Sequence, residues 1–331
     1  MKAANLPSSI RSATAALLLL LLLLSAEALA VQPASAAAPT PITIKASSTG
    51  AYATGSRLYQ LSGEALRISG RVSSYAPDQK IKVRVYVDGA KVRVRTVPLL
   101  DAGGGKGRFT VRMRVWKTGR LTARAIHDGS SVMGPASALI RPIRIYSAVN
   151  RIGSRGVGVG VLHSMLRRLG YWSPYGETYS AGTGKAVLAF RKVNRMSRIE
   201  SASPTIYRLL HQGRGRMGAR RPDLGVHVEA DLSRQVIGFF NGKRATEVHV
   251  TSSGKPSTPT ILGSYRFYRR EPGTNSHGMV YSMYFHNGYA IHGYAELPTY
   301  PASHGCLRVW VPNAIRIYNK IRIGEWITVY R

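Results

Sequence analysis

The chain has 331 residues, 44% of them hydrophobic, so it is long enough for two or three domains and apolar enough to fill their cores. This composition excludes a disordered tail. Lysine and arginine number 47 against 15 acidic residues, and the resulting net charge of +32 attracts the chain to polyanions. The basic residues are spread over every segment, which indicates a solvated basic surface more than a dedicated docking site.

Residues 1–36 have the pattern of a secretory signal. Lys2 and Arg11 precede an apolar run at residues 13–24, and residues 34–36 read Ala-Ser-Ala, a small-residue cleavage site. The run has 12 residues, fewer than the roughly 20 that a membrane-spanning helix needs, and no later stretch is apolar enough to span. We therefore expect an exported protein, periplasmic or associated with the cell wall, with no transmembrane segment after cleavage.

Export limits the partners that the positive charge can meet. Cleavage after Ala36 removes Lys2, Arg11 and Glu27, which leaves a charge of +31 (32 − 2 + 1). Outside the cytoplasm the available polyanions are anionic cell-wall polymers, peptide carboxylates and lipid headgroups, so no nucleic acid partner is expected. A nucleic-acid-binding function stays open only if the signal fails to direct export.

Residues 41–146 show the alternation and turn signals of an antiparallel sheet. Isoleucine and valine alternate with lysine, arginine and tyrosine over residues 81–87, and Asp88-Gly89 then predicts a tight hairpin. Residues 109–115 and 121–125 repeat the alternation. About seven short strands over roughly 100 residues predict an Ig-like β-sandwich. It carries no catalytic constellation, so we expect a spacing or wall-contact role.

Residues 151–212 change to a helical period. Apolar residues at 161–169 share one helix face that Gly170 ends, Thr183 is placed to cap a second helix, and a third apolar set follows at 206–210. The segments LRRLGYW and AVLAFRKVNRM resemble the small three-helix peptidoglycan-binding module of many wall enzymes. His163 and Arg191 stand where that module usually has glutamines, so the resemblance implies the fold and leaves ligand binding open. A purely structural bundle is the alternative.

Residues 213–225 are rich in glycine, arginine and proline without apolar periodicity, which predicts a linker that frees the next domain. Residues 226–331 then begin with strands that include an Asn241-Gly242 hairpin, and end with a short helix and a closing strand. The chain as a whole is therefore predicted to be multidomain and mainly β.

Cys306 is the only cysteine of the chain. An unpaired cysteine in an exported protein indicates a reactive thiol, and a nearby imidazole or backbone dipole lowers the pKa of such a thiol toward neutrality. His292 and His304 are the candidate imidazoles, and the residues alone do not decide which one is the base. An inert buried thiol is one alternative. A zinc site is another, although the closely spaced ligand pairs usual for zinc do not occur, and no metal or cofactor is expected.

The pattern H-G, nine residues, then S-H-G-C-L-R resembles the signature of the L,D-transpeptidase catalytic domain. The upstream run VEADLSRQVIGFFNGK and the turn around Thr258-Pro259-Thr260 are similar to that family as well. The resemblance implies a mostly antiparallel β domain over residues 226–331 with the cysteine at the rim of a cleft. The site residues that it implies are Cys306 as nucleophile, His292 as general base, the Gly293 carbonyl as the group that orients His292, and the Gly305 and Cys306 amides as oxyanion hole.

The resemblance also implies a reaction and a substrate pocket. Cys306 would form a thioester with a peptidoglycan stem peptide, and a second stem amine would resolve it into a 3→3 cross-link. Hydrolysis of the thioester would make the chain an L,D-carboxypeptidase, and an idle thiol would leave a non-catalytic peptidoglycan-binding wall protein. The residues expected to line the substrate pocket are Ser303, His304, Arg308, Tyr294 and Tyr300.

Overall fold

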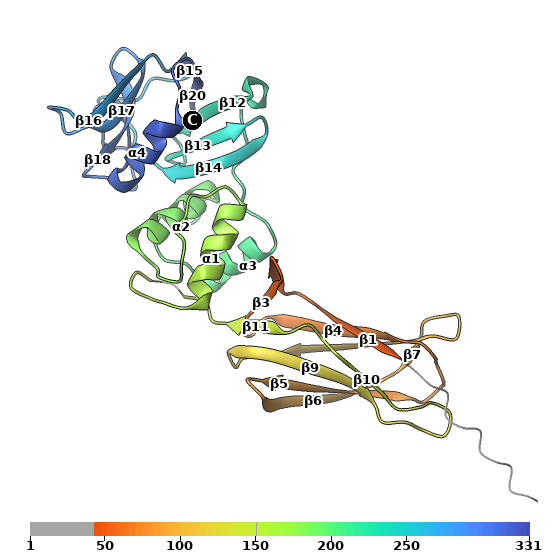
Figure 1. Ribbon diagram of the computed structural model, residues 1–331. Helices are drawn as coiled ribbons and strands as arrows, with labels where there is room; N and C mark the ends of the chain where they lie inside the picture. Colours follow the sequence, from red (N-terminus) through yellow and green to blue (C-terminus); the bar gives the residue numbers. More distant parts are fainter. Residues whose placement is uncertain (1–42, 150) are drawn as a thin grey trace, which may run out of the picture. The chain divides into compact units, whose positions relative to one another are not determined.

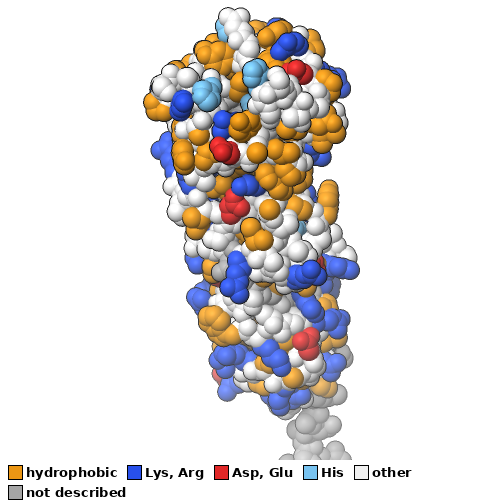
Figure 2. All heavy atoms as spheres, turned by 90° about the vertical axis from the view of Figure 1, so that its left-hand side faces the viewer, with side chains coloured by type: hydrophobic (Ala, Val, Ile, Leu, Met, Phe, Trp, Pro, Cys, Tyr) orange, Lys and Arg blue, Asp and Glu red, His pale blue; other side chains and the backbone are white. Residues whose placement is uncertain are grey.

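The computed structural model describes residues 43–149 and 151–331. The expected signal sequence at residues 1–36 lies outside the described residues, as does the very start of the expected sandwich. No helix in the described ranges is both long and apolar enough to cross a lipid bilayer. Figure 2 shows lysine and arginine side chains scattered over the face in view with few acidic ones between them, as the charge distribution of the sequence indicates.

The first part of the described chain consists of two β-sheets around one core (Figure 1). One sheet has the order β1-β4-β8-β7, with β1 Ile44–Thr49, β4 Ala65–Val72, β7 Leu100–Asp101 and β8 Gly107–Arg114. The other has the order β2-β3-β11-β9-β5-β6 with β10 paired to β9; its strands are β2 Tyr52–Thr54, β3 Arg57–Leu61, β5 Lys80–Val87, β6 Ala90–Pro98, β9 Gly119–His127, β10 Ala136–Leu139 and β11 Ile143–Tyr146.

Hydrophobic alternation places the long strands of these sheets. In β8 every second residue is buried, and β5 likewise buries its isoleucine and valines while lysine, arginine and tyrosine face outward. The Asp88-Gly89 hairpin between β5 and β6 is confirmed, and both residues have positive φ, as a tight hairpin turn requires. The sequence did not locate β1, β3 or β4, nor the strands of two to four residues β2, β7, β10 and β11. In β4 a Ser-Gly pair interrupts the apolar alternation, and a strand of two to four residues carries no readable alternation. The Ig-like assignment itself stays a prediction.

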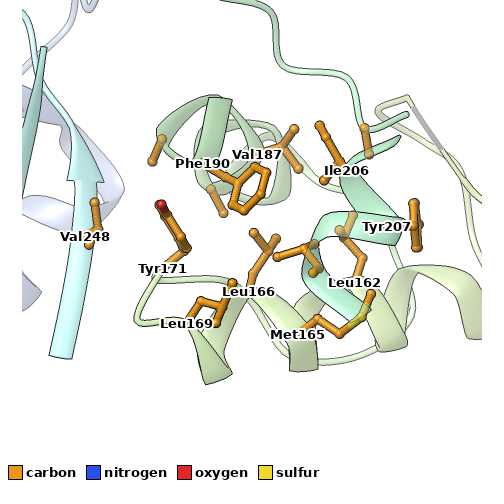
Figure 3. Packing of buried hydrophobic residues seen from close by; sticks show 14 of the residues in the cluster. Leu162, Met165, Leu166, Leu169, Tyr171, Val187, Phe190, Ile206, Tyr207 and Val248 are labelled. Atoms are coloured by element: carbon orange, nitrogen blue, oxygen red, sulfur yellow. The ribbon is translucent and has the colours of Figure 1, made fainter. Parts of the chain in front are cut away.

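Three helices follow, α1 Val157–Arg168, α2 Ala181–Val193 and α3 Pro204–His211. Figure 3 shows their apolar side chains converging on one core. The expected cap of α2 was one turn off: Ser180 is the N-cap, and Thr183 lies at the third helical position, where its hydroxyl accepts from the Ser180 amide at 3.1 Å. Ser180 and Thr183 thus form a capping box together. Because both residues take part in it, the sequence alone does not show which of them is the N-cap.

His163 and Arg191, the two residues at which the helical part departs from the pattern that it resembles, are both buried. His163 is fully buried in α1, and its ring nitrogens contact the Gly176 carbonyl at 3.0 Å and the Thr183 hydroxyl at 2.8 Å. The Arg191 guanidinium donates to the Ser201 carbonyl at 2.9 Å. Both side chains therefore use their polar atoms in hydrogen bonds with backbone carbonyl and hydroxyl groups inside the helical part.

The expectation that residues 213–225 free the next domain is wrong. Met217 is fully buried in the same core as the three helices, and the Tyr171 hydroxyl donates to the Gly215 carbonyl at 2.6 Å. The amides of Arg220 and Arg221 both donate to the buried Glu229 carboxylate. Glycine and arginine content suggested a flexible segment, but the tertiary contacts of its backbone fix it.

The helical part also shares its core with the strands that follow. Val248 of β14 (Arg244–Val250) packs toward Tyr171, as Figure 3 shows, and Tyr171 forms a bridge with Val248. One apolar cluster therefore includes residues of all three helices and of β14.

The last part has two sheets and one helix. The first sheet has the order β14-β13-β12-β20-β15, with β12 Val226–Asp231, β13 Val236–Asn241, β15 Gly263–Arg266 and β20 Trp326–Tyr330. The second has the order β16-β17-β18-β19, with β16 Arg269–Thr274, β17 Val280–His286, β18 Tyr289–Tyr294 and β19 Leu307–Trp310. Most pairs are antiparallel, as predicted, but β12 pairs with β20 and β18 with β19 in parallel.

The helix α4 (Val311–Lys320) is held to the first sheet by a buried carboxylate. The Arg316 guanidinium donates two hydrogen bonds to Glu247 of β14, at 2.7 and 2.9 Å, and the Lys320 ammonium lies 3.4 Å from the same carboxylate. His249 contacts Glu247 at 2.7 Å. These contacts keep the pKa of the Glu247 carboxyl far below its ordinary range in spite of its burial.

Candidate active site

The parallel pair β18 and β19 brings the candidate nucleophile and base to adjacent segments. His292 lies opposite Arg308 in the register, and continuing that register backward sets Cys306 opposite Ala290. His292 and Arg308 are paired and therefore share a face of the sheet. Cys306 lies in the bend immediately before β19, and its Sγ donates to the Gly288 carbonyl at 3.6 Å, just before β18 begins. An ideal continuation of the strand pair, with strands about 4.8 Å apart and a rise of about 3.3 Å per residue, would set the Cα atoms of Cys306 and His292 about 8 Å apart.

His292 is held in one orientation and one tautomer. Its side chain is buried, and its Nδ1 lies 2.9 Å from the Gly293 carbonyl oxygen. A carbonyl can only accept, so Nδ1 carries the proton and donates it, which leaves the lone pair on Nε2. The Tyr294 ring lies nearly perpendicular to the imidazole, with ring centres 5.8 Å apart. The imidazole is thus set up to take a proton at Nε2.

Gly293 is required for this arrangement because α4 packs directly against it. A Cβ at this position would lie 2.7 Å from the Ala314 Cβ and 3.1 Å from the Val280 Cβ. The absence of a side chain lets the helix approach the strand that presents His292.

Burial shifts the pKa of the base downward. Removal from water lowers the pKa of His292 to about 4; the hydrogen bond to Gly293 opposes this shift and the positive charge of Arg308 adds to it. The imidazole is therefore neutral at neutral pH.

The thiol departs from the expectation drawn from the sequence. Burial raises the pKa of the Cys306 thiol, and the Ala290 backbone and the Arg308 charge only partly oppose it. The expected lowering of the thiol pKa is thus wrong, because the groups that create the site also withdraw it from water. The resting pair is a neutral thiol beside a neutral imidazole, so the proton must move as the sulfur attacks.

A hydroxyl inside the turn fixes the backbone before Cys306. Ser303 Oγ accepts from the Gly305 amide at 3.1 Å and donates to the Cys306 carbonyl at 2.6 Å. Gly305 has φ +124°, and a Cβ there would lie 2.8 Å from the Tyr289 ring. Because the Gly305 amide already donates to Ser303, its part in an oxyanion hole, together with the Cys306 amide, stays a prediction.

A neighbouring backbone segment holds this turn from the other side. Ser252 and Arg308 exchange backbone hydrogen bonds at 3.1 and 3.0 Å, and the Ser253 carbonyl accepts from the Ser303 amide at 2.9 Å. The Thr260 hydroxyl accepts from the Gly254 amide at 2.9 Å and donates to the Gly305 carbonyl at 2.7 Å. These supporting residues were not among the predicted site residues, although the serine, glycine and threonine turn was noted as a family feature.

The remaining predicted residues lie around this centre. Arg308 is buried, with its guanidinium 4.0 Å above the Tyr294 ring and 3.9 Å from the Glu296 carboxylate. His304 is exposed, with Nε2 3.5 Å from the Lys255 ammonium. Tyr300 is 60% exposed, and its carbonyl accepts from the Ser252 hydroxyl at 2.6 Å. Arg308 and Tyr294 thus join the centre, while His304 and Tyr300 lie at its solvent side.

The described residues contain no group of three or more histidine, cysteine, aspartate or glutamate side chains able to hold a metal ion.

A cysteine next to a strand that carries a backbone-oriented histidine is an arrangement typical of cysteine-dependent acyl-transfer enzymes. The family profile described as L,D-transpeptidase catalytic domain (YkuD) matches residues 225–329. A solved L,D-transpeptidase from Xylanimonas cellulosilytica is 30% identical; the similarity covers 54% of this chain and 96% of that one, with a TM-score of 0.50. The chain therefore belongs to the L,D-transpeptidase family.

Two further solved structures are more distant. The L,D-transpeptidase from Stackebrandtia nassauensis is 18% identical, covering 56% of this chain and 96% of that one, with a TM-score of 0.34. The catalytic domain of the Enterococcus faecium L,D-transpeptidase is 23% identical, covering 32% and 98%, with a TM-score of 0.28. Comparison with curated protein sequences gave no match.

Proposed function

We propose that this protein is an exported cell-wall L,D-transpeptidase that forms 3→3 peptidoglycan cross-links through a thioester on Cys306. The observation that carries the proposal is the His292 geometry: a buried imidazole that donates its Nδ1 proton to the Gly293 carbonyl and keeps its lone pair on Nε2, on the strand that pairs with the strand directly after Cys306. Membership of the family supports peptidoglycan stem peptides as substrates and a site of action outside the cytoplasm.

The first half-reaction forms the acyl-enzyme. The Cys306 sulfur attacks the carbonyl carbon after the third residue of a donor tetrapeptide, while the thiol proton passes to His292 Nε2. Collapse of the tetrahedral intermediate breaks the peptide bond, and the leaving D-alanine amine takes the proton back from His292. The products are a thioester and free D-alanine.

The second half-reaction resolves the thioester. The side-chain amine of a second stem attacks the thioester carbonyl and gives a proton to His292, and the departing sulfur recovers it as a thiol. The new amide is the 3→3 cross-link. Water in place of the amine would release a tripeptide, and the same residues would then perform an L,D-carboxypeptidase reaction.

Intact-mass spectrometry tests the proposal directly, because the chain has one cysteine. Incubation with a stem tetrapeptide should add the mass of the tripeptide acyl group to the wild-type protein and release D-alanine. Cys306→Ala should show no adduct, and His292→Gln should form it far more slowly. His277→Gln, which alters an exposed imidazole of the same domain, is the matched control and should behave as the wild type.

Addition of an acceptor stem peptide then separates the reactions. A cross-linked dimer supports the transpeptidase, and a free tripeptide alone supports the carboxypeptidase. No adduct on folded, reduced protein would overturn both and leave a non-catalytic wall-binding protein.

A further inference from the structure

A cavity of about 510 Å³ lies away from Cys306, where the end of α2, the turn between β12 and β13, and the end of β20 meet. The lysines and arginines that line it are Lys192, Arg195, Arg198, Arg220, Arg234 and Arg331. Asp231 is the acidic side chain among the lining residues, and Arg234 already neutralises it at 3.1 Å. A concave surface lined mainly by positive charges concentrates their electrostatic field inside the cavity, so this cavity attracts anions.

Several of these cations are held in place. The Arg198 guanidinium donates to the Thr299 carbonyl at 2.7 Å and to the Ser233 carbonyl at 3.0 Å. The Arg220 guanidinium lies 4.7 Å above the Tyr330 ring. Guanidinium groups that are already fixed lose little conformational entropy when a ligand binds, which favours specific binding of an anion over non-specific electrostatic attraction.

The backbone at Arg195 gives an independent observation. Its amide donates to the Lys192 carbonyl and the next amide to the Arg191 carbonyl, a helix end that glycine or asparagine normally closes. Arg195 nevertheless occupies that position with φ +55°, a backbone conformation that is strained for any residue with a Cβ. A strained arginine on the wall of a cationic cavity points to a use for its charge.

We propose that this cavity binds a phosphodiester polymer of the cell envelope. Cations that reach the cavity from several chain segments can satisfy the tetrahedral oxygens of phosphate, whereas one guanidinium satisfies a planar carboxylate. The position of the cavity, apart from Cys306, makes it a docking site that holds the protein to anionic wall material.

Calorimetric titration with oligo(glycerol phosphate), inorganic phosphate and polyglutamate tests the proposal. The phosphodiester oligomer should bind more tightly than either other probe, with an affinity that falls as salt rises. Arg195→Gly should weaken binding about tenfold, the effect of losing one charge-assisted hydrogen bond. It should also raise or preserve the melting temperature, because it relieves the positive φ.

The matched control is Arg124→Gln, which removes an exposed arginine of the sandwich. It should change the affinity less than twofold. Equal weakening by both variants, tighter binding of polyglutamate, or no binding of the oligomer would overturn the proposal.

A second, independent observation concerns a buried ammonium group. Lys192 of α2 is 3% exposed, and its Nζ donates to the Gln235 carbonyl at 3.1 Å and the Thr251 carbonyl at 3.2 Å. Burial lowers the pKa of Lys192 to about 7, and the nearby charges of Arg198 and Lys185 add to the shift. Removing an ammonium group from water is unfavourable, so the retention of this lysine calls for a role.

Hydrogen bonds lead from these two carbonyls to the catalytic turn. The Thr251 hydroxyl donates to the Arg308 carbonyl at 2.8 Å. The Gln235 amide side chain exchanges hydrogen bonds with Ser253, at 2.7 and 2.9 Å, and the Ser253 carbonyl accepts from the Ser303 amide. Ser303 in turn fixes the backbone of Cys306.

We infer that Lys192 is a positioning residue for the acylation of Cys306, an inference that rests on the proposed function. Lys192→Met should lower kcat about tenfold with little change in KM, because it loosens the turn that aims the sulfur and leaves the substrate pocket in place. The melting temperature should change little, since an apolar side chain replaces a buried charge. Lys192→Arg should restore part of kcat.

Lys185→Met is the matched control, because Lys185 lies on the same helix but pairs with Glu200. It should leave kcat unchanged. An inactive wild type would refute the proposed function, whereas an active wild type with an equally active Lys192→Met would refute only the positioning role.

Discussion

The rate of Cys306 acylation should fall on the acid side only at a pH far below the one at which histidine ordinarily titrates. The base must be neutral to accept the thiol proton, and burial lowers the pKa of His292 to about 4 from an ordinary value near 6.5. At pH 5 an imidazole with the lowered pKa is about 90% neutral, whereas one with the ordinary pKa is about 3% neutral. The two cases therefore differ about thirtyfold in the acylation rate at that pH.

The assay is the second-order rate of acyl-enzyme formation with a stem tetrapeptide, measured by intact mass from pH 4.5 to 8. The rate should stay nearly constant down to pH 5.5 and fall only below it, with circular dichroism confirming that the protein remains folded. Arg308→Gln removes a positive charge that disfavours protonation, so it should move the midpoint to higher pH. His277→Gln should leave the profile unchanged. A midpoint near pH 6.5 in the wild type would refute this account of the base.

Four further outcomes follow from the same structure. Gly305→Ala should slow acylation at least tenfold and destabilise the fold by about 1–3 kcal/mol, measured by urea unfolding, because φ is positive and a tyrosine ring blocks the new methyl group. Iodoacetamide should alkylate the single cysteine with a rate midpoint at higher pH in the folded chain than in the unfolded one, because burial raises the thiol pKa. Arg316→Met should cost about 3 kcal/mol, since it removes the main partner of the buried Glu247. The free energy of unfolding should decline as pH falls from about 6.5 to about 4, by roughly 3 kcal/mol for each of His163 and His292. In this pH range the two imidazoles become protonated in the unfolded chain but stay neutral in the folded one, which favours unfolding.

Each of these has a result that contradicts it. Gly305→Ala with unchanged kinetics would show that the turn tolerates a side chain. Equal alkylation midpoints in the two states would place the thiol in water. Arg269→Met is the control for Arg316→Met, because Arg269 is exposed, and equal losses would refute the role of Glu247. A free energy of unfolding that stays flat between pH 6.5 and 4 would mean that the histidines are not withdrawn from solvent.

Local patterns predicted much of the fold because they depend on neighbours in sequence. Alternation located β5, β8 and β9 of the sandwich, and the Asp88-Gly89 turn was found from its two residues. The same reasoning missed β4 (Ala65–Val72), in which a Ser-Gly pair interrupts the alternation, and the shortest strands, such as β7 (Leu100–Asp101), because their pairing partners decide them. It misjudged residues 213–225, since nothing local shows that Met217 enters a core built by three helices.

The candidate site was likewise predictable from the sequence only in part. The lone cysteine and its two candidate histidines were visible in the sequence, and so was the glycine after His292. The support of the catalytic turn by Thr260 and Ser253 was not, because these residues come from a segment distant in sequence. The sequence did not show that Cys306 is withdrawn from water either. This burial raises the pKa of its thiol, whereas a lowering was expected.

The sequence by itself determined the chemistry that is available: one thiol, nearby imidazoles, and strands able to carry them. Only the tertiary structure decided which imidazole lies on a strand next to the thiol, in which tautomer, and with what pKa. The parallel register of β18 and β19 brings His292 and Cys306 to adjacent segments, and burial of His292 lowers its pKa. Register and burial are set by contacts between distant segments, whereas residue type and spacing are properties of the chain alone.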